Sequence, residues 1–214
     1  MTAVAWALLV PAIAVALVDW YAVATERRDL EYVAKPLTMV LLIGVALTLT
    51  PADPTMRTWF VAALVLSLAG DVFLMLPAEK LFVAGLGSFL VGHVAYVVGF
   101  AAGGLSGGRL LVGAVLTGTA MLAVGPTIIK GAKDVDPMLA VPVFLYIAVI
   151  SVMVAVAIGS GVTIAVVGAV LFYLSDTCIG WSRFVQPFEW SRLAIITTYH
   201  LGQLFLVLSL VVAR

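Results

Sequence analysis

The run MLAVPVFLYIAVISVMVAVAI, residues 138–158, contains no charged side chain. A stretch this long and this apolar is typical of a helix that crosses a membrane, which takes about 20 residues. Similar runs continue on both sides of it, because 64% of the 214 residues are hydrophobic, only 10% are charged and the mean hydropathy is +1.23. Soluble domains are roughly 25% charged. The sequence therefore excludes a water-soluble globular protein.

Seven further apolar runs, separated by Pro, Gly and charged residues, predict the other membrane spans. The predicted spans are 3–24, 34–50, 58–77, 82–101, 109–129, 138–158, 162–181 and 191–212. The first lacks the positively charged start of a cleaved signal, so we expect it to be retained. The single cysteine, Cys178, lies inside an apolar run and is interpreted as a packing residue. We expect one all-α domain over residues 1–214, a bundle of eight transmembrane helices.

Lys and Arg are unequally distributed between alternate loops. One side holds Arg27, Arg28, Lys35, Lys80, Lys130, Lys133, Arg183 and Arg192, and the other holds Arg57, Arg109 and Arg214. The positive-inside tendency makes the first side cytoplasmic. It predicts a bacterial-type plasma-membrane protein with both termini outside. The formal net charge of zero leaves no basic surface for a nucleic-acid partner.

Ionisable side chains inside the spans are few, and each costs several kcal/mol unless it is paired or faces a wet cavity. They are Asp19, Asp71, His93, Asp176 and His200, with the hydrogen-bonding Tyr146, Tyr199 and Gln203 beside them and Lys35 at the mouth of the second span. All lie in the predicted cytoplasmic half or near the midplane. This asymmetry predicts a pocket entered from one side. Alternatively, the three Asp only bridge helices and His93 is a packing residue.

Two Asp–His patterns indicate a possible internal repeat. Asp71 and His93 in spans three and four match Asp176 and His200 in spans seven and eight, at offsets of 105 and 107 residues. A shift of four helices keeps both units parallel, and duplicated transporters often bind ligands at such a repeat interface. The pattern predicts a 4+4 parallel repeat that brings Asp71 and Asp176 together.

The order and spacing of these residues resemble the YhhN-type lysoplasmalogenase family of integral membrane proteins, nearly end to end. The resemblance rests on Lys35-Pro36, Ser67-x-x-Gly70-Asp71-x-x-Leu74, Phe82-x-x-Gly85-x-x-Ser88-Phe89-x-x-Gly92-His93-x-x-Tyr96, Gly168-Ala169-x-Leu171-Phe172-x-x-Ser175-Asp176, Arg183-Phe184 and Tyr199-x-x-x-Gln203. It implies eight transmembrane helices and hydrolysis of the vinyl ether bond of a lysoplasmalogen to a fatty aldehyde and a glycerophospho-alcohol such as glycerophosphocholine or glycerophosphoethanolamine. It also points to Asp71 and Asp176. The family more often has an aromatic residue where this chain has His200, which is therefore not expected to be essential.

Vinyl ether hydrolysis begins with proton transfer to the β-carbon and gives an oxocarbenium ion that water captures. A desolvated carboxyl pair suits this step, because burial and mutual repulsion keep one carboxyl protonated while its partner stays ionised. We therefore expect Asp71 and Asp176 to form that pair, with the acid unassigned. His93 would assist as a third catalytic residue. The substrate-binding candidates are Lys35, Tyr146, Tyr199, Gln203, Arg183 and Asp19, with Lys35 and Arg183 at the rim for the lipid phosphate.

Three other functions stay open on the sequence alone. A zinc hydrolase could use His and Asp from several helices, but the two histidines lie on different spans and no HxxxH pair is present, so we expect neither a metal nor another cofactor. A proton-coupled transporter of a small molecule or lipid would use the three Asp and the repeat. A non-catalytic lipid-binding bundle would have the same pocket. The expected partner is a lysophospholipid in the membrane.

Overall fold

The computed structural model describes residues 1–76 and 79–212. Its helices are α1 (Ala3–Ala24), α2 (Arg28–Thr48), α3 (Pro54–Met75), α4 (Glu79–Ala102), α5 (Gly107–Val135), the short 3-10 helix η1 (Pro137–Leu139), α6 (Ala140–Ser160), α7 (Thr163–Phe184) and α8 (Ser191–Ser209). All eight α-helices are long and apolar enough to cross a membrane. The described residues contain no strand, so the predicted all-α, eight-helix membrane fold is confirmed.

Two helices extend six residues beyond one end of their predicted spans. α2 begins at Arg28, where the span was predicted to begin at residue 34, and α5 continues to Val135, beyond the predicted end at residue 129. Charged residues interrupt a hydropathy pattern, but Arg, Lys and Glu are good helix formers, so the helices continue past the apolar stretch. Lys35, expected at the mouth of its span, lies about two turns inside α2, and its side chain is 15% exposed.

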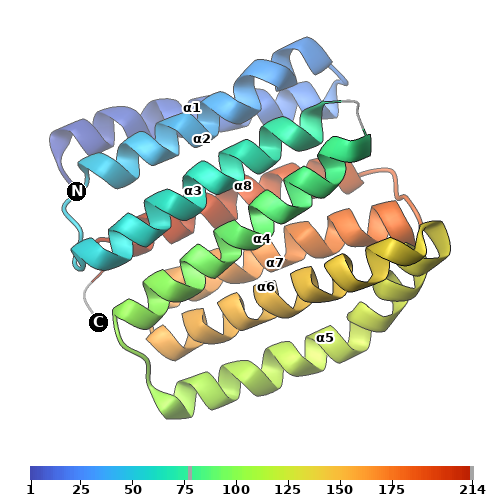
Figure 1. Ribbon diagram of the computed structural model, residues 1–214. Helices are drawn as coiled ribbons and strands as arrows, with labels where there is room; N and C mark the ends of the chain where they lie inside the picture. Colours follow the sequence, from blue (N-terminus) through green and yellow to red (C-terminus); the bar gives the residue numbers. More distant parts are fainter. Residues whose placement is uncertain (77–78, 213–214) are drawn as a thin grey trace.

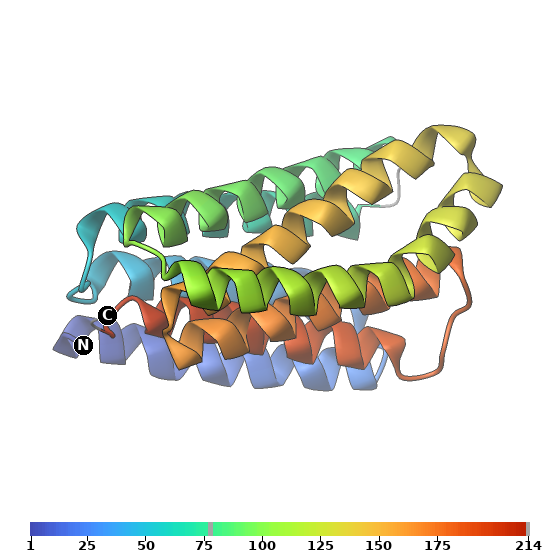
Figure 2. The ribbon, with the colours of Figure 1, turned by 90° about the horizontal axis from the view of Figure 1, so that it is seen from below.

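Consecutive helices pack as four antiparallel hairpins, α1–α2, α3–α4, α5–α6 and α7–α8 (Figure 1). Figure 2 shows α3 and α4 in one layer, α1, α7 and α8 in another, and α6 crossing obliquely between them. α6 also packs against α4 and α7, while α8 contacts α1, α2 and α3. This arrangement brings α3, α4, α6, α7 and α8 around one interior region.

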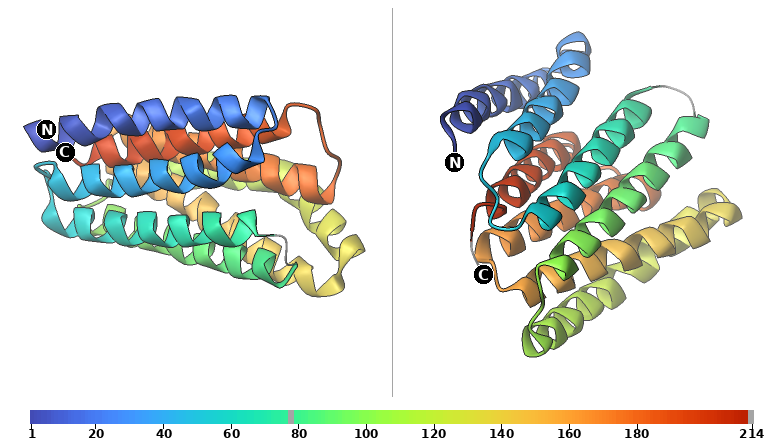
Figure 3. Two further views of the ribbon diagram at one scale, coloured as in Figure 1. Left: turned by 90° about the horizontal axis from the view of Figure 1, so that it is seen from above. Right: turned by 60° about the vertical axis from the view of Figure 1, so that its left-hand side comes forward.

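The α1–α2, α3–α4, α5–α6 and α7–α8 turns lie at one end of the bundle, which we call the basic end because the α1–α2, α5–α6 and α7–α8 segments carry most of the Lys and Arg residues. The start of α1 and the end of α8 lie at the opposite end (Figure 3). Pro77, Ala78 and Arg214 lie outside the described residues, as does the side chain of Lys80. The predicted end of the third span and part of the predicted charge count fall there.

Glycines allow α7 and α8 to approach closely. A Cβ atom on Gly168 would lie 2.9 Å from the Gly202 carbonyl oxygen, and one on Gly202 would lie 3.0 Å from the Gly168 carbonyl oxygen. Small residues serve this purpose at helix interfaces in membranes, where close backbone packing replaces the hydrophobic effect. Close packing near Gly168 fixes the position of α7, which carries Asp176 two turns further on.

Candidate active site

Two side chains, from α6 and α4, converge on one carboxylate oxygen of a third side chain, on α7. Tyr146 on α6 donates a hydrogen bond of 2.5 Å from its hydroxyl to Oδ2 of Asp176 on α7. Nε2 of His93, on α4, lies 3.0 Å from the same Oδ2 and 3.2 Å from the Tyr146 hydroxyl. His93 is fully buried, whereas the Asp176 side chain keeps 8% of its surface exposed. Because two hydrogen-bonding side chains meet the same oxygen, they fix the orientation of the Asp176 carboxyl group.

The helices fix this geometry through neighbouring contacts. One turn before Asp176, the Phe172 ring packs edge-on against the His93 ring, with 4.7 Å between centroids. The hydroxyl of Ser175, next to Asp176, donates a hydrogen bond of 3.0 Å to the Ile195 carbonyl on α8. An aromatic contact and an interhelical hydrogen bond therefore orient α7, so that Asp176 faces α4 and α6.

Asp71 lies in a separate ionic cluster. Its Oδ1 is 3.0 Å from Nζ of Lys35, on α2, and its Oδ2 accepts a hydrogen bond of 2.6 Å from the Tyr199 hydroxyl, on α8. The Lys35 ammonium also lies 5.8 Å from the centre of the Tyr199 ring. Asp71 is 1% exposed. Both carboxylate oxygens are thus occupied by protein groups.

Aromatic rings separate the two carboxylates. Phe172 contacts His93 on one side and Tyr199 on the other, at 4.7 and 5.3 Å between ring centroids. Phe89 adds ring contacts to Phe172 and Tyr199. Among the described residues no hydrogen bond joins Asp71 to Asp176, so the structure places the two expected partners in adjacent networks. Sequence reasoning missed Phe89 and Phe172 because a Phe in a membrane helix gives no signal of its own, although both stand in the family-like motifs.

The remaining polar candidates lie away from Asp176. The Gln203 side-chain oxygen accepts a hydrogen bond of 2.6 Å from the Tyr96 hydroxyl. His200 accepts one of 3.2 Å from the Trp20 ring nitrogen, and its Nε2 lies 3.9 Å from Oδ2 of Asp19. Asp19 is completely buried, and neither of its oxygens has a hydrogen-bond partner in the described part of the chain. The structure brings Asp19 and His200 together, but on the α1 side of the bundle.

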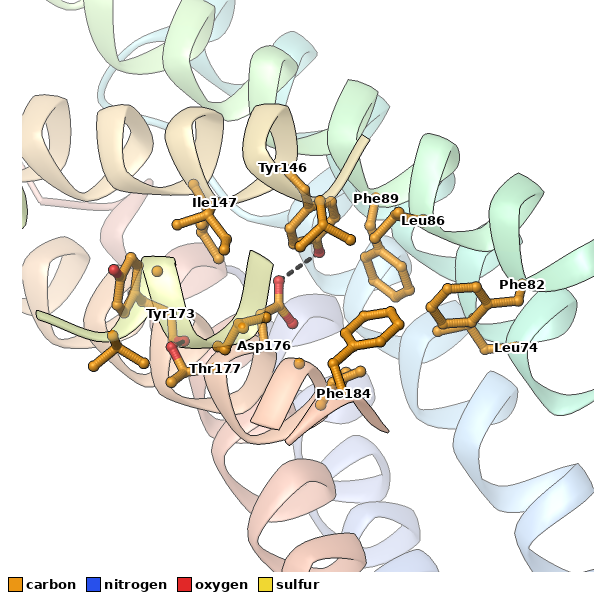
Figure 4. A pocket seen from close by; sticks show the side chains of 17 residues that line it. Leu74, Phe82, Leu86, Phe89, Tyr146, Ile147, Tyr173, Asp176, Thr177 and Phe184 are labelled. Carbon is orange, nitrogen blue, oxygen red and sulfur yellow. Dashed lines mark hydrogen bonds between the residues drawn. The ribbon is translucent and has the colours of Figure 1, made fainter. Parts of the chain in front are cut away.

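A pocket opens beside Asp176. Its walls are mostly apolar residues of α3 to α7, with the hydroxyl-bearing Tyr146, Tyr173 and Thr177 among them, and Asp176 is the one charged residue among the described residues that line it. Tyr146 and Asp176 meet at its centre, and the second oxygen of Asp176 points away from Tyr146 (Figure 4). That oxygen, Oδ1, has no hydrogen-bond partner among the described side chains and is not enclosed by protein atoms. The pocket therefore presents one carboxyl oxygen to an apolar ligand.

Arg183 lies at the edge of this pocket, near the basic end of α7. Its guanidinium carbon is 3.8 Å from the centre of the Phe82 ring, and both Phe82 and Phe184 line the pocket. Stacking on an aromatic face holds the cation while leaving its N–H groups available for an anion. Of the two predicted phosphate ligands, Arg183 borders the pocket, whereas Lys35 is paired with Asp71 behind the aromatic residues.

Within the described residues, no cluster of three or more His, Cys, Asp or Glu side chains could hold a metal ion. The groups that meet beside the pocket are a carboxyl, a phenol and an imidazole.

Curated relatives carry a consistent name. The chain is 35% identical over 147 residues to lysoplasmalogenase TMEM86B of Homo sapiens, covering 69% of this chain and 61% of that protein. It is 32% identical over 174 residues to human lysoplasmalogenase TMEM86A, covering 76% and 69%. The lysoplasmalogenase of Mycobacterium tuberculosis is 33% identical over 172 residues, covering 73% of this chain and 64% of that protein.

The chain matches only part of the length of the curated relatives, whereas the family model matches most of the chain. The chain spans about 61% of the human TMEM86B protein, which is less than two thirds of its length. No solved structure matches the chain. The YhhN family model, in contrast, matches residues 30–210, which include every helix from α3 to α8 and the residues of the pocket. The chain belongs to the YhhN family.

Proposed function

We propose that the protein hydrolyses the vinyl ether bond of lysoplasmalogens. The observation that carries the proposal is the pocket: an apolar cavity with one carboxyl oxygen facing into it and a cation at its edge. A lysolipid has the complementary parts, an alkenyl chain, an acid-labile bond and a phosphate. The name that curated relatives share supports the same reaction.

Asp176 is the acid in this proposal. Its Oδ2 is already held by Tyr146 and His93, so the proton to be transferred lies on Oδ1, the oxygen that faces the pocket. Transfer of that proton to the vinyl carbon remote from the ether oxygen leaves a positive charge shared between the other vinyl carbon and that oxygen. The Asp176 carboxylate then stabilises the cation by charge, as a carboxylate does in glycoside cleavage.

Water completes the reaction. Its oxygen adds to the carbon next to the ether oxygen, and the proton it loses returns to Asp176. The hemiacetal then collapses: its hydroxyl loses a proton and becomes the aldehyde carbonyl, the bond between that carbon and the glycerol oxygen breaks, and the glycerol oxygen gains a proton. His93 and Tyr146 hold the carboxylate oriented through both steps.

Lys35 and Asp71 have a supporting role in the proposal. Their ion pair and the Tyr199 hydrogen bond satisfy both oxygens of Asp71, which is therefore not available as an acid. The cluster instead keeps Tyr199 in place, and Tyr199 supports the aromatic residues behind His93. Asp71 thus acts on the pocket through packing.

We also propose a plasma-membrane location with the basic end toward the cytoplasm. Eight Lys and Arg residues on that side against three on the other support this orientation. The substrate would then enter from the inner leaflet, with its phosphate at the level of Arg183.

The test uses purified protein in detergent or nanodiscs with two matched lipids, a lysoplasmalogen and the saturated-ether lysolipid with the same head group and chain length. We expect fatty aldehyde from the first lipid and none from the second, because only a vinyl ether accepts a proton on carbon. Release from both lipids, or from neither, would contradict the proposal.

A further inference from the structure

The pocket extends in two directions from Asp176. Phe184, at the basic end of α7, is eight residues from Asp176, about 12 Å along the helix, whereas Tyr173 lies one turn away in the opposite direction. Figure 4 shows the same arrangement along the pocket, with Leu74 and Phe82 on one side of Asp176 and Ile147 and Tyr173 on the other. We name the first part, lined by Leu74, Phe82 and Phe184, the head arm, and the second part the chain arm.

The charge at the head arm determines which end of a lysolipid fits there. Arg183 stacks on Phe82, a head-arm residue, and can bind a phosphate. The chain arm has no charged side chain among the described residues that line it, and it lies further from the basic end of the bundle. A lysolipid therefore fits with its phosphate at Arg183, its ether bond at Asp176 and its hydrocarbon chain in the chain arm.

One wall of the chain arm has no side chain. Gly125 of α5 is buried and lines the pocket. A Cβ atom there would meet only the ends of Met121 and Ile147, at 3.7 and 3.9 Å, which are ordinary contacts. Gly113 on the same helix is different, since a Cβ atom there would lie 2.7 Å from the Ala155 carbonyl oxygen. Close helix packing therefore accounts for Gly113 and does not account for Gly125.

The following proline does not account for it either. Pro126 disfavours a helical conformation at the residue before it, and glycine relieves part of that clash. However, Pro11 in α1 follows Val10, and Pro36 in α2 follows Lys35, with both helices continuous through these positions. Glycine inside a helix also costs about 1 kcal/mol relative to alanine. What the glycine at position 125 provides is space in the chain arm.

We propose that Gly125 determines which hydrocarbon chains the pocket accepts. The absent side chain leaves the chain arm wide enough for a long alkenyl chain, and a larger residue there would restrict the protein to short chains. This inference rests on the proposed function for the identity of the lipid. The expected loss of affinity grows with chain length, because each methylene kept out of the arm loses its van der Waals contacts with the pocket wall.

The experiment compares Gly125→Leu and Gly125→Ala with Gly118→Leu. Gly118 lies two turns earlier on α5, does not line the pocket, and has nothing within 4 Å of a Cβ position. The three variants therefore share the change in helix propensity but differ in what the new side chain fills. Aldehyde release is measured with long-chain and short-chain lysoplasmalogens, and binding of the two saturated-ether analogues is measured by calorimetry.

We expect Gly125→Leu to lower kcat/KM and affinity for the long-chain lipid at least about tenfold, because the new side chain crowds the arm, while the short-chain values stay within about threefold. Gly125→Ala should lower the ratio of long-chain to short-chain kcat/KM by a smaller factor than Gly125→Leu does. Gly118→Leu should leave this ratio unchanged. Equal losses for both chain lengths, or an unchanged ratio, would overturn the inference. Absence of aldehyde from the wild-type protein would count against the proposed function alone, since binding still reports the chain-length ratio.

Discussion

Asp71 and Asp176 occupy similar positions near the basic ends of α3 and α7, yet their surroundings differ. Both carboxylate oxygens of Asp71 have partners: Oδ1 pairs with Lys35, and Oδ2 accepts a hydrogen bond from Tyr199. Asp176 has one oxygen held by Tyr146 and His93 and the other open to the pocket. An opposite charge beside Asp71 favours its ionised form, whereas Asp176 has a neutral phenol and an imidazole beside it. The comparison shows that a carboxyl's partners, rather than its depth in the membrane, separate a structural ion pair from a candidate acid.

The largest effect on stability is expected in the ionic cluster of Asp71, Lys35 and Tyr199. Lys35→Met leaves the Asp71 charge buried without its cation, which should cost about 3 kcal/mol and lower the melting temperature in detergent by about 10 °C. The double variant Lys35→Met/Asp71→Asn removes both charges and should recover most of that loss. If the single variant melts like the wild-type protein, the ion pair does not contribute as we describe.

The two tyrosines provide a matched pair of smaller changes. Tyr146→Phe removes a hydrogen bond to Asp176, the proposed acid, and should lower kcat about tenfold to a hundredfold, with little change in melting temperature. Tyr199→Phe removes the equivalent bond to Asp71 and should mainly lower the melting temperature. Steady-state kinetics and thermal unfolding of both proteins check this, and an exchange of the two outcomes would reverse our assignment of the two carboxylates.

A change at the pocket edge should affect binding more than chemistry. Arg183→Gln removes the cation stacked on Phe82 and should raise KM about tenfold while kcat falls less than about threefold. Kinetics with a lysoplasmalogen and with the corresponding alkenyl glycerol, which lacks the phosphate, separate the two effects. An equal rise in KM for both substrates would show that Arg183 supports the fold and does not bind phosphate.

The smallest effect on activity is expected at Asp19. Asp19→Asn removes a buried group whose oxygens have no hydrogen-bond partner in the described chain, and it lies on the α1 side, away from the pocket. Activity should therefore stay within about twofold of wild type. The fold should tolerate the change as well, because a neutral amide is cheaper to bury than a charge. A large loss of kcat in correctly folded Asp19→Asn protein would place Asp19 in the catalytic machinery after all.

The sequence was sufficient to predict the eight helices, because long apolar runs have few other structures available to them in a membrane. It also identified Asp176, His93 and Tyr146, since polar groups stand out against such runs. It could not show which polar groups meet. The position of a residue along its helix indicates its depth in the membrane, but it does not indicate which neighbouring helix the side chain faces. For this reason the sequence suggests Lys35 as a ligand of the lipid phosphate, whereas the structure pairs Lys35 with Asp71.

The internal repeat stays a prediction. A symmetric arrangement would pair His200 with Asp71 as His93 pairs with Asp176. The structure instead places Tyr199 on Asp71 and His200 between Trp20 and Asp19. Adjacent residues on α8 face different neighbours, and spacing in the sequence did not distinguish which of them faces α3.

The most direct test measures aldehyde formation per folded molecule by Asp176→Asn and by Lys35→Met/Asp71→Asn, side by side with the wild-type protein. Removing a general acid lowers kcat by about a thousandfold, whereas replacing both members of a buried ion pair leaves a neutral, packed site. We predict that Asp176→Asn loses about a thousandfold in kcat and that the double variant stays within about tenfold of wild type. A near-normal rate for Asp176→Asn together with an inactive double variant would contradict the account.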